Sequence, residues 1–260
     1  MRFKLTLQVD KKAFGNVLPL SYQYELSAFI YRAIAQADKE YSLWLHENGF
    51  QLLGRSFKLF TFSNLLIPQY KIDKEQGRIR IESDRIEWVV SFLPETSTEK
   101  FAFGLFSEQI FQIGDKKSTV QFRIEQIELV PDPVFNSSMM FCTMSPVCIT
   151  LKEADSRYPT YLSPDAPEAQ SVLLNNLLNK YHTFYGKPFE EAPDFSFEVV
   201  SQPKPKLISI KTGTPETSNI RGFMFDFRMK APVELMKIMY DAGLGEKNSI
   251  GFGMVGLKEK

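Results

Sequence analysis

The sequence predicts an α+β protein in which one arrangement of strands and helices occurs twice. Two observations lead to this prediction. The 260 residues are enough for two domains of ordinary size, and the order of strand-like and helix-like segments in the first half returns in the second. With 43% hydrophobic and 24% charged residues, the chain can also bury real cores.

The first half begins with a strand and a helix. Residues 2–9 alternate apolar and polar side chains at period two, which is typical of a strand. From Ser21 to Ala37, apolar residues recur at helical spacing, and Ser21 is a candidate N-cap. Asp38 then offers the N-cap of a second helix.

Strands and one long helix complete the first half. The stretch "PETSTEKFAFGLFSEQIFQIG" begins at a helix-starting proline and ends at Gly114, so we expect a helix over 94–114. Turn chemistry without apolar periodicity in "PDPVFNSS" (131–138) predicts a boundary between domains 1–132 and 138–260. Strand-like segments lie at 57–67, 78–83, 86–93 and 118–130.

The second half repeats this order. A helix is expected over 165–186, ending at Gly186, and another over "APVELMKIMYDAGLG", with Pro232 in its first turn and Gly243 at its end. Each half then follows β-α-β-β-α-β, which predicts two tandem ferredoxin-like domains, the sandwich that RNA-recognition modules also use, with a cleft between them. The strand-like segments are 139–152, 195–200, 206–211, 220–230 and 252–258.

Composition narrows the class of protein. No apolar run reaches the roughly 18 residues of a membrane span, and the strand-like start does not resemble a signal peptide. Cys142 and Cys148 are the only cysteines, which favours a reducing, cytoplasmic location. Their spacing inside a strand-like stretch fits no metal pattern, so we expect no metal site.

A glycine-rich segment near the C-terminus is the most unusual feature. "GLGEKNSIGFG" (243–253) holds four of the chain's 14 glycines and follows a helix, the reverse of the order in a P-loop. Glycine permits positive φ and close backbone approach, so successive amides can point into one concavity and bind phosphate oxygens. The alternative is a glycine-terminated helix followed by a glycine bulge.

Charge distribution supports an anionic ligand at this segment. A formal net charge of zero argues mildly against nucleic-acid binding. However, residues 201–260 hold ten basic against six acidic residues, whereas 153–198 hold three against eight. The positive charge therefore lies in the same part of the chain as the glycines.

Several motifs together carry a resemblance to a known family. "GLGEKNSIGFGMV" resembles the C-terminal glycine-rich motif of the sixth Cas family of CRISPR-associated endoribonucleases, within the RAMP superfamily, which cut precursor CRISPR RNA in its repeats. "QYELSAFIYRAI" (23–34), "LHENGF" (45–50) and "FKLFTFS" (57–63) resemble its N-terminal half in the same order, and "TMSPVCI" (143–149) resembles the start of its second domain.

The resemblance implies a reaction and its residues. It implies metal-independent, cofactor-free cleavage by a ribose 2′-hydroxyl, which leaves a 2′,3′-cyclic phosphate and a 5′-hydroxyl. His46 matches the family's catalytic histidine, Tyr31 its tyrosine and Lys58 its lysine, with Arg55 as an alternative to Lys58. Which of His46 and Tyr31 is the base and which the acid stays open.

Helix geometry constrains the two catalytic candidates of the first half. At about 100° per residue, Tyr31 falls nearly opposite the apolar stripe of its helix, so its ring faces a ligand, a partner or a second layer. One unbroken helix would separate Tyr31 and His46 by about 22 Å, too far to share one phosphate. We therefore expect the chain to turn near Asp38.

The expected partner is CRISPR repeat RNA, as substrate and as a product that family members often retain. The resemblance also implies that the protein can join a multi-subunit interference complex, with no membrane and no small-molecule cofactor involved. Phosphate contacts would come from the glycine segment and from basic residues of the second domain. The candidates are Gly243, Gly245, Lys247, Asn248, Ser249, Gly251, Gly253, Lys204, Lys206, Lys211 and Arg221.

Three other functions compete with cleavage. A non-cleaving member of the superfamily would bind guide RNA as a scaffold, although it would have no need of Tyr31 and His46. A pair of general RNA-recognition domains would carry aromatic residues on the sheet, which "RIRIES" and "QFRIEQIEL" lack. An α+β module for small molecules or protein partners would also have a net charge near zero.

Overall fold

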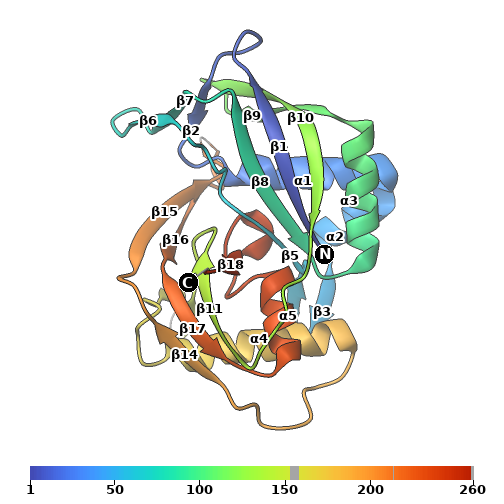
Figure 1. Cartoon of the computed structure of the whole chain (residues 1–260), viewed down its shortest axis with the longest axis vertical. Coiled ribbons are helices and arrows are strands. Elements are labelled where there is room, and N and C mark those ends of the chain that lie inside the picture. Colours follow the sequence, from blue (N-terminus) through green and yellow to red (C-terminus); the bar gives the residue numbers. More distant parts are fainter. Residues whose placement is uncertain (153–157, 213, 259–260) are drawn as a thin grey trace.

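The fold consists of two lobes, each with its own antiparallel sheet and helices, as the computed structural model in Figure 1 shows. The structure describes residues 1–152, 158–212 and 214–258. Buried side chains from residues 3 to 124 form one hydrophobic cluster, most of those from 141 to 255 form a second, and Cys148, Ile208, Ile220 and Phe252 form a small third one. None of the described helices is long and apolar enough to cross a membrane.

The N-terminal sheet has five strands in the order β5-β8-β1-β10-β9, all antiparallel. Helices α1 (Gln23–Ala37) and α3 (Glu95–Ser107) cover one of its faces (Figure 1). Without β9 the order is that of a ferredoxin-like βαββαβ unit. The strands are β1 (Arg2–Asp10), β5 (Phe60–Phe62), β8 (Arg85–Phe92), β9 (Ile110–Gly114) and β10 (Thr119–Val130).

The C-terminal sheet repeats this order as β14-β17-β11-β18, with helices α4 (Ala169–Tyr185) and α5 (Val233–Ala242). The prediction of an α+β chain with two tandem ferredoxin-like units is confirmed. Both C-terminal helices end at the predicted glycines, since Gly186 and Gly243 take positive φ angles of 72° and 86°. The strands are β11 (Ser138–Thr143), β14 (Ser196–Val199), β17 (Asp226–Lys230) and β18 (Val255–Leu257).

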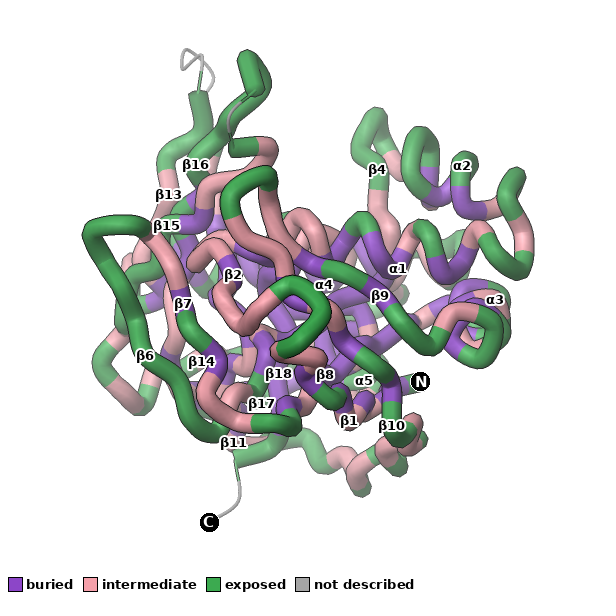
Figure 2. Tube along the Cα trace, turned by 90° about the horizontal axis from the view of Figure 1, so that it is seen from above, coloured by how far each residue is buried: buried purple, intermediate pink, exposed green. Residues whose placement is uncertain are grey.

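Smaller helices and strands are added to the two units. Buried residues concentrate along the main strands and inner helix faces, and exposed ones along β6 and the outer side of α2 (Figure 2). The additions are α2 (Lys39–Glu47), the three-stranded sheet β2 (Val17–Pro19), β7 (Arg78–Ile81) and β6 (Tyr70–Asp73), the hairpins β3 (Phe50–Leu52) with β4 (Arg55–Phe57) and β15 (Lys204–Ile210) with β16 (Ser218–Met224), the pair β12 (Thr150–Leu151) with β13 (Thr160–Tyr161), and the 3₁₀ turn η1 (Asn248–Ile250).

The helix expected over 94–114 is wrong in its second part. α3 ends at Ser107, and residues 110–114 form β9 at the edge of the sheet. Phe111 and Ile113 are buried while Ile110 and Gln112 are exposed, which is the period-two pattern of a strand. Pairing with β10 therefore overrides the apparent helical continuity of this segment.

Three predicted strands are interrupted. The 57–67 strand breaks at Leu59, which takes a positive φ of 54°, so β4 and β5 are separate elements. The 139–152 strand stops at Thr143, shortly before Pro146, which has no N–H to give to a ladder. The 220–230 strand splits around Phe225 into β16 and β17, which pair with different partners.

Ser21 does not cap α1. The helix begins at Gln23 without a side-chain cap. Instead, the hydroxyl oxygen of Ser21 accepts a hydrogen bond from the backbone N–H of Ser209 at 3.1 Å. Ser21 therefore ties hairpin β15–β16 of the second lobe to the first.

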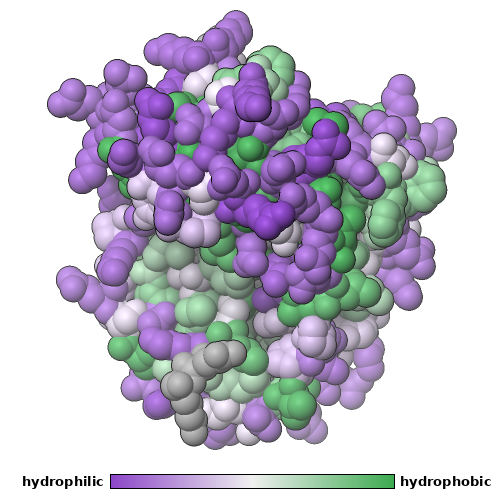
Figure 3. All heavy atoms as spheres, turned by 45° about the horizontal axis from the view of Figure 1, so that its top comes forward, coloured by the Kyte–Doolittle hydropathy of each residue, from purple (hydrophilic) through white to green (hydrophobic). Residues whose placement is uncertain are grey.

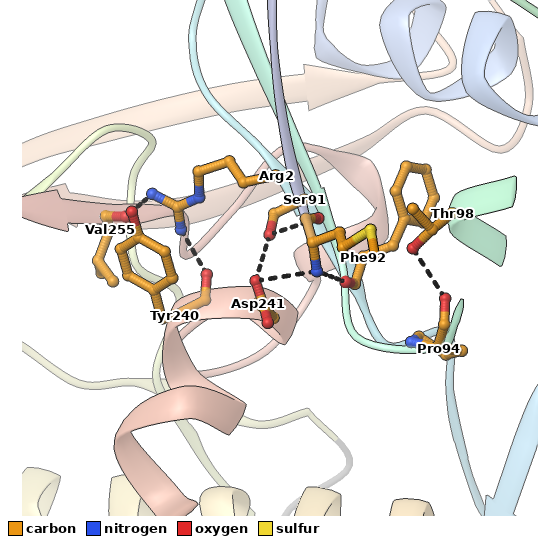
Figure 4. Close-up of polar contacts among 9 residues, drawn as sticks. Arg2, Ser91, Phe92, Pro94, Thr98, Tyr240, Asp241 and Val255 are labelled. Atoms are coloured by element: carbon orange, nitrogen blue, oxygen red, sulfur yellow. Dashed lines mark hydrogen bonds and ion pairs between the residues drawn. The ribbon is translucent and has the colours of Figure 1, made fainter. Parts of the chain in front are cut away.

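A second polar joint connects the lobes at the N-terminal end of β1 (Figure 4). The guanidinium of Arg2 is buried, donates to the carbonyl oxygens of Val255 at 2.8 Å and of Tyr240, and lies over the Tyr240 ring. The Ser91 hydroxyl donates to the Asp241 carboxylate at 2.9 Å, and burial raises the pKa of that carboxyl. Charge-assisted bonds of this kind hold α5 and β18 against the first sheet.

Candidate active site

A cleft of about 660 Å³ lies between the two lobes and gathers charged side chains from both. Of its described lining residues five are cationic and two are carboxylates, so this part of the lining is positive although the whole chain is neutral. This favours an anionic ligand. The charged lining residues are Arg55, Lys58, Lys152, Lys180, Lys247, Glu47 and Glu246, and His46 stands among them.

The chain turns where the sequence predicts. α1 ends at Ala37, and the Asp38 side chain caps α2 by accepting from the backbone N–H of Tyr41 at 2.9 Å. The hydroxyl of Ser42 donates to the Tyr31 carbonyl at 2.7 Å, so α2 folds back along α1. The rings of Tyr31 and His46 then meet edge to face with centroids 4.9 Å apart. A straight helix over 21–47 is excluded.

Tyr31 lies between α2 and the glycine-rich segment. Its ring contacts His46 and, at 5.6 Å between centroids, Phe60 of β5. Burial raises the pKa of the Tyr31 phenol above its usual range, and a hydrogen bond with the Ser249 side chain opposes this shift. The phenol therefore stays protonated near neutral pH and acts as a hydrogen-bond donor.

Lys58 is held beside His46. Its ammonium donates to the His46 carbonyl oxygen at 2.8 Å, and burial lowers its pKa. The approach requires Gly49, which has a φ of +61° and whose added Cβ would lie 2.8 Å from Cδ of Lys58 and 2.7 Å from the Phe57 carbonyl oxygen. Arg55 lines the same cleft from β4. Both candidates for the role of the family's lysine, Lys58 and Arg55, therefore line it.

The glycines of 243–253 fold the segment on itself and against the first lobe. A Cβ on Gly253 would fall well inside van der Waals contact with the Leu244 carbonyl, and one on Gly251 would meet Phe62 at 2.8 Å. Gly243, Gly251 and Gly253 therefore serve close packing inside the protein, and only Gly245 of the four glycines lines the cleft. Contact of RNA with Gly243, Gly251 and Gly253 stays a prediction.

Three successive residues of the same segment line the cleft and have backbone N–H groups without an acceptor among the described residues. Lys247 takes a left-handed conformation, with φ 62°, immediately before η1. For the backbone N–H groups of Lys247, Asn248 and Ser249, no acceptor is found among the described residues, and all three residues line the cleft. Such a run of free amides suits an anion.

Comparison with known proteins agrees with these observations. The model of the family described as CRISPR-associated protein Cas6, N-terminal, matches residues 17–127, and that of Cas6, C-terminal, matches 130–257. CRISPR-associated endoribonuclease Cas6 1 of Methanocaldococcus jannaschii is 33% identical over 98% of this chain and 92% of its own length. The chain belongs to the Cas6 family.

Other Cas6 proteins show the same likeness. CRISPR-associated endoribonuclease Cas6 of Pyrococcus furiosus is 29% identical over 98% of this chain and 89% of its own length. A solved structure of a Cas6-related gene product from Pyrococcus furiosus covers 100% of this chain and 99% of its own, with a TM-score of 0.84 and 27% identity. A RAMP protein described as binding different RNA substrates has a TM-score of 0.82, 25% identity and full coverage of both chains.

Four predicted RNA contacts lie elsewhere on this Cas6 chain. Lys204, Lys206, Lys211 and Arg221 belong to hairpin β15–β16 or its tip, and they are not among the described residues that line the cleft. Lys211 forms an ion pair with Glu216. The other three side chains are exposed.

Lys180 is a functional candidate that sequence reasoning missed. It lies on α4, is only 2% exposed, and reaches the cleft wall from the second lobe. The sequence did contain a signal for a buried lysine, because Lys180 follows Leu173 and Leu177 on the buried stripe of an amphipathic helix. A lysine at such a position needs polar partners inside the fold.

A second groove between the lobes differs in character. It has a volume of about 830 Å³, and hydrophobic surface also crosses the middle of the face in Figure 3, between more hydrophilic regions. Its described lining residues include neither a histidine nor a lysine. The apolar residues of this groove include Leu65, Leu66, Ile67, Ile86, Met144 and Met224.

Proposed function

We propose that the chain is a CRISPR-associated endoribonuclease that cuts precursor CRISPR RNA within its repeats to give guide RNAs, and that the interlobe cleft is its active site. The observation that carries the proposal is the edge-to-face contact of Tyr31 and His46 beside the Lys58 ammonium. A scaffold that only bound RNA would not need these three groups assembled at a cationic cleft.

The proposed reaction is attack of a ribose 2′-oxygen on the adjacent phosphorus. His46 takes the 2′ proton, because the Tyr31 phenol is already protonated and cannot act as the base. Tyr31 donates its phenolic proton to the departing 5′-oxygen. The P–O5′ bond breaks, which leaves a 2′,3′-cyclic phosphate and a 5′-hydroxyl.

Charge stabilisation would come from both walls of the cleft. One donor of the Lys58 ammonium binds the His46 carbonyl, so two remain for the phosphorane. Residues 247–249 line the same space, so their free amides and the Lys247 ammonium would supply further donors. In this assignment residues 1–132 form the domain that carries the catalytic groups, and 138–260 form the domain that carries the glycine-rich segment.

RNA outside the cleft would follow hairpin β15–β16. Lys204, Lys206 and Arg221 are exposed there and suit phosphate contacts that add affinity and salt dependence. The RNA is both substrate and retained product in this account, and the product complex is the form that would enter a multi-subunit interference complex.

A modified RNA tests the reaction. A repeat RNA carrying a single 2′-deoxyribose immediately 5′ of the cut should bind with unchanged affinity and not be cut at that bond, because the nucleophile is missing. The unmodified RNA and one with the deoxyribose three nucleotides away are the controls. Cleavage at the deoxy position would exclude attack by the 2′-hydroxyl.

Lys58 and Arg55 can be separated by substitution. We expect Lys58→Met to slow single-turnover cleavage by about 10²- to 10³-fold, the usual effect of losing one group that stabilises developing negative charge. Arg55→Met removes a cation from the same cleft and should slow it less than about 10-fold. The reverse order of the two rates would assign the role to Arg55.

A further inference from the structure

We propose that Lys180 is a positioning residue that holds the glycine-rich segment in the shape required for cleavage; this inference rests on the function proposed above. The Lys180 ammonium reaches from α4 into the middle of the segment. It donates to the carbonyl oxygens of Gly243 at 2.6 Å and Gly245 at 3.0 Å, and to Oδ1 of Asn248 at 2.8 Å.

These bonds use all three donors of the ammonium. The side chain is 2% exposed, so the ammonium has no donor left for RNA even though the residue lines the cleft. Lys180 therefore acts through the segment that it holds and not by contact with the reacting atoms.

Asn248, which Lys180 holds in place, also bonds to both ends of the segment. Its Nδ2 group donates to the carbonyl oxygens of Leu244 at 3.3 Å and Phe252 at 3.1 Å, so one side chain joins both ends of the loop. Its Oδ1 has Lys180 as partner. The hydrogen bonds of Lys180 and Asn248 therefore close the segment into a ring around the Lys180 ammonium.

The next residue along the chain connects the ring to the catalytic groups. The Ser249 carbonyl accepts from the Ser27 hydroxyl of α1 at 2.6 Å, and the Ser249 side chain interacts with the Tyr31 phenol and opposes the rise of its pKa. A shift of the segment therefore moves Ser249 and changes the surroundings of the Tyr31 phenol. Displacements of about 1 Å at an active site can cost about 10²-fold in rate.

The position of Lys180 also makes the segment sensitive to pH. Burial lowers the pKa of the Lys180 ammonium to about 7, and the Glu246 carboxylate opposes this shift. Above that pH most molecules carry a neutral amine with two N–H donors for three acceptors, so one bond of the ring is lost. Among the residues that the structure describes, the other charged or titratable groups along this cleft are His46, Glu47, Arg55, Lys58, Lys152 and Lys247.

The kinetic test compares Lys180→Met with Lys187→Met. Lys187 lies just beyond α4, is exposed and pairs with Glu190. We expect Lys180→Met to slow single-turnover cleavage of repeat RNA by about 10²-fold near pH 6.5, while RNA affinity changes by less than about 5-fold. At pH 9 the ratio of the unsubstituted rate to the Lys180→Met rate should be smaller by up to about 10-fold. This factor corresponds to the usual contribution of one hydrogen bond.

A spectroscopic test does not depend on the variant folding. In a His46→Ala chain, backbone amide NMR shifts of Gly245 and Ser249 should titrate with a midpoint near the lowered Lys180 pKa of about 7. This chain lacks the His46 ring, so that ring cannot supply the signal. Where Lys180→Met folds, as thermal unfolding will show, the titration should vanish in the double variant.

The results separate this inference from the proposed function. A folded Lys180→Met protein that cuts as fast as the unsubstituted chain would overturn the role of Lys180, and amides that do not titrate between about pH 5.5 and pH 9 would overturn its pH dependence. Failure of the unsubstituted chain to cut repeat RNA would instead overturn the proposed function, while amide shifts that differ between the His46→Ala chain and the double variant would still show that Lys180 contacts the segment.

Discussion

His46→Ala is expected to slow single-turnover cleavage of repeat RNA by about 10³-fold, within the range for loss of a general base. His46 is the one histidine at the cleft, and its ring contacts the Tyr31 ring at 4.9 Å between centroids. Its side chain is exposed at the end of α2 and supports no core packing, so the fold and RNA affinity should change little.

The chain offers a matched control for this substitution. His182 is the only other histidine, lies in the last turn of α4 and does not line the cleft. His182→Ala should cleave at the rate of the unsubstituted protein. Equal rates for the His46→Ala and unsubstituted proteins, or a loss of RNA binding that accounts for the whole effect, would remove His46 from the reaction.

Gly253→Ala is expected to lower the free energy of unfolding by about 3 kcal/mol and to abolish cleavage. The cost combines a positive φ of 79° with a methyl group forced against the Leu244 carbonyl and the Asn248 side chain. The Leu244 carbonyl is backbone, so this part of the clash cannot be relieved by rotating a side chain. The measurement is urea unfolding of the variant followed by single-turnover cleavage.

Gly77→Ala isolates the conformational part of that cost. Gly77 has a φ of +64° in the loop between β6 and β7, and a Cβ there would meet no atom within 4 Å. We expect Gly77→Ala to lower the free energy of unfolding by about 1 kcal/mol and to leave the cleavage rate unchanged. If Gly253→Ala were no less stable than Gly77→Ala, the segment would be loosely packed and its close contacts would not matter.

Local chemistry was enough to predict much of the fold. Turn residues, helix-ending glycines and the Asp38 cap are decided within a few residues of chain, so the order of elements and the turn that brings His46 back to Tyr31 follow from sequence. Residues 110–114 could not be assigned in this way, because their helical or strand state depends on pairing with β10.

The candidate site was likewise predictable only in part. Motifs identified Tyr31, His46 and Lys58, and the fold brings them together. The role of the glycines was harder to predict, since glycine permits close approach to a ligand and to the protein's own backbone equally well. Lys180 was missed because its partners are carbonyl groups more than sixty residues away.

Cleavage of a 5′-labelled repeat RNA by excess protein in EDTA tests the central claim most directly. The account predicts one discrete cut, a product that gains a free 3′ end only after the cyclic phosphate is opened and removed, and loss of the cut in His46→Ala. Tight binding of the RNA with no cut, equal in the two proteins, would contradict it and make the cleft a binding site without catalysis.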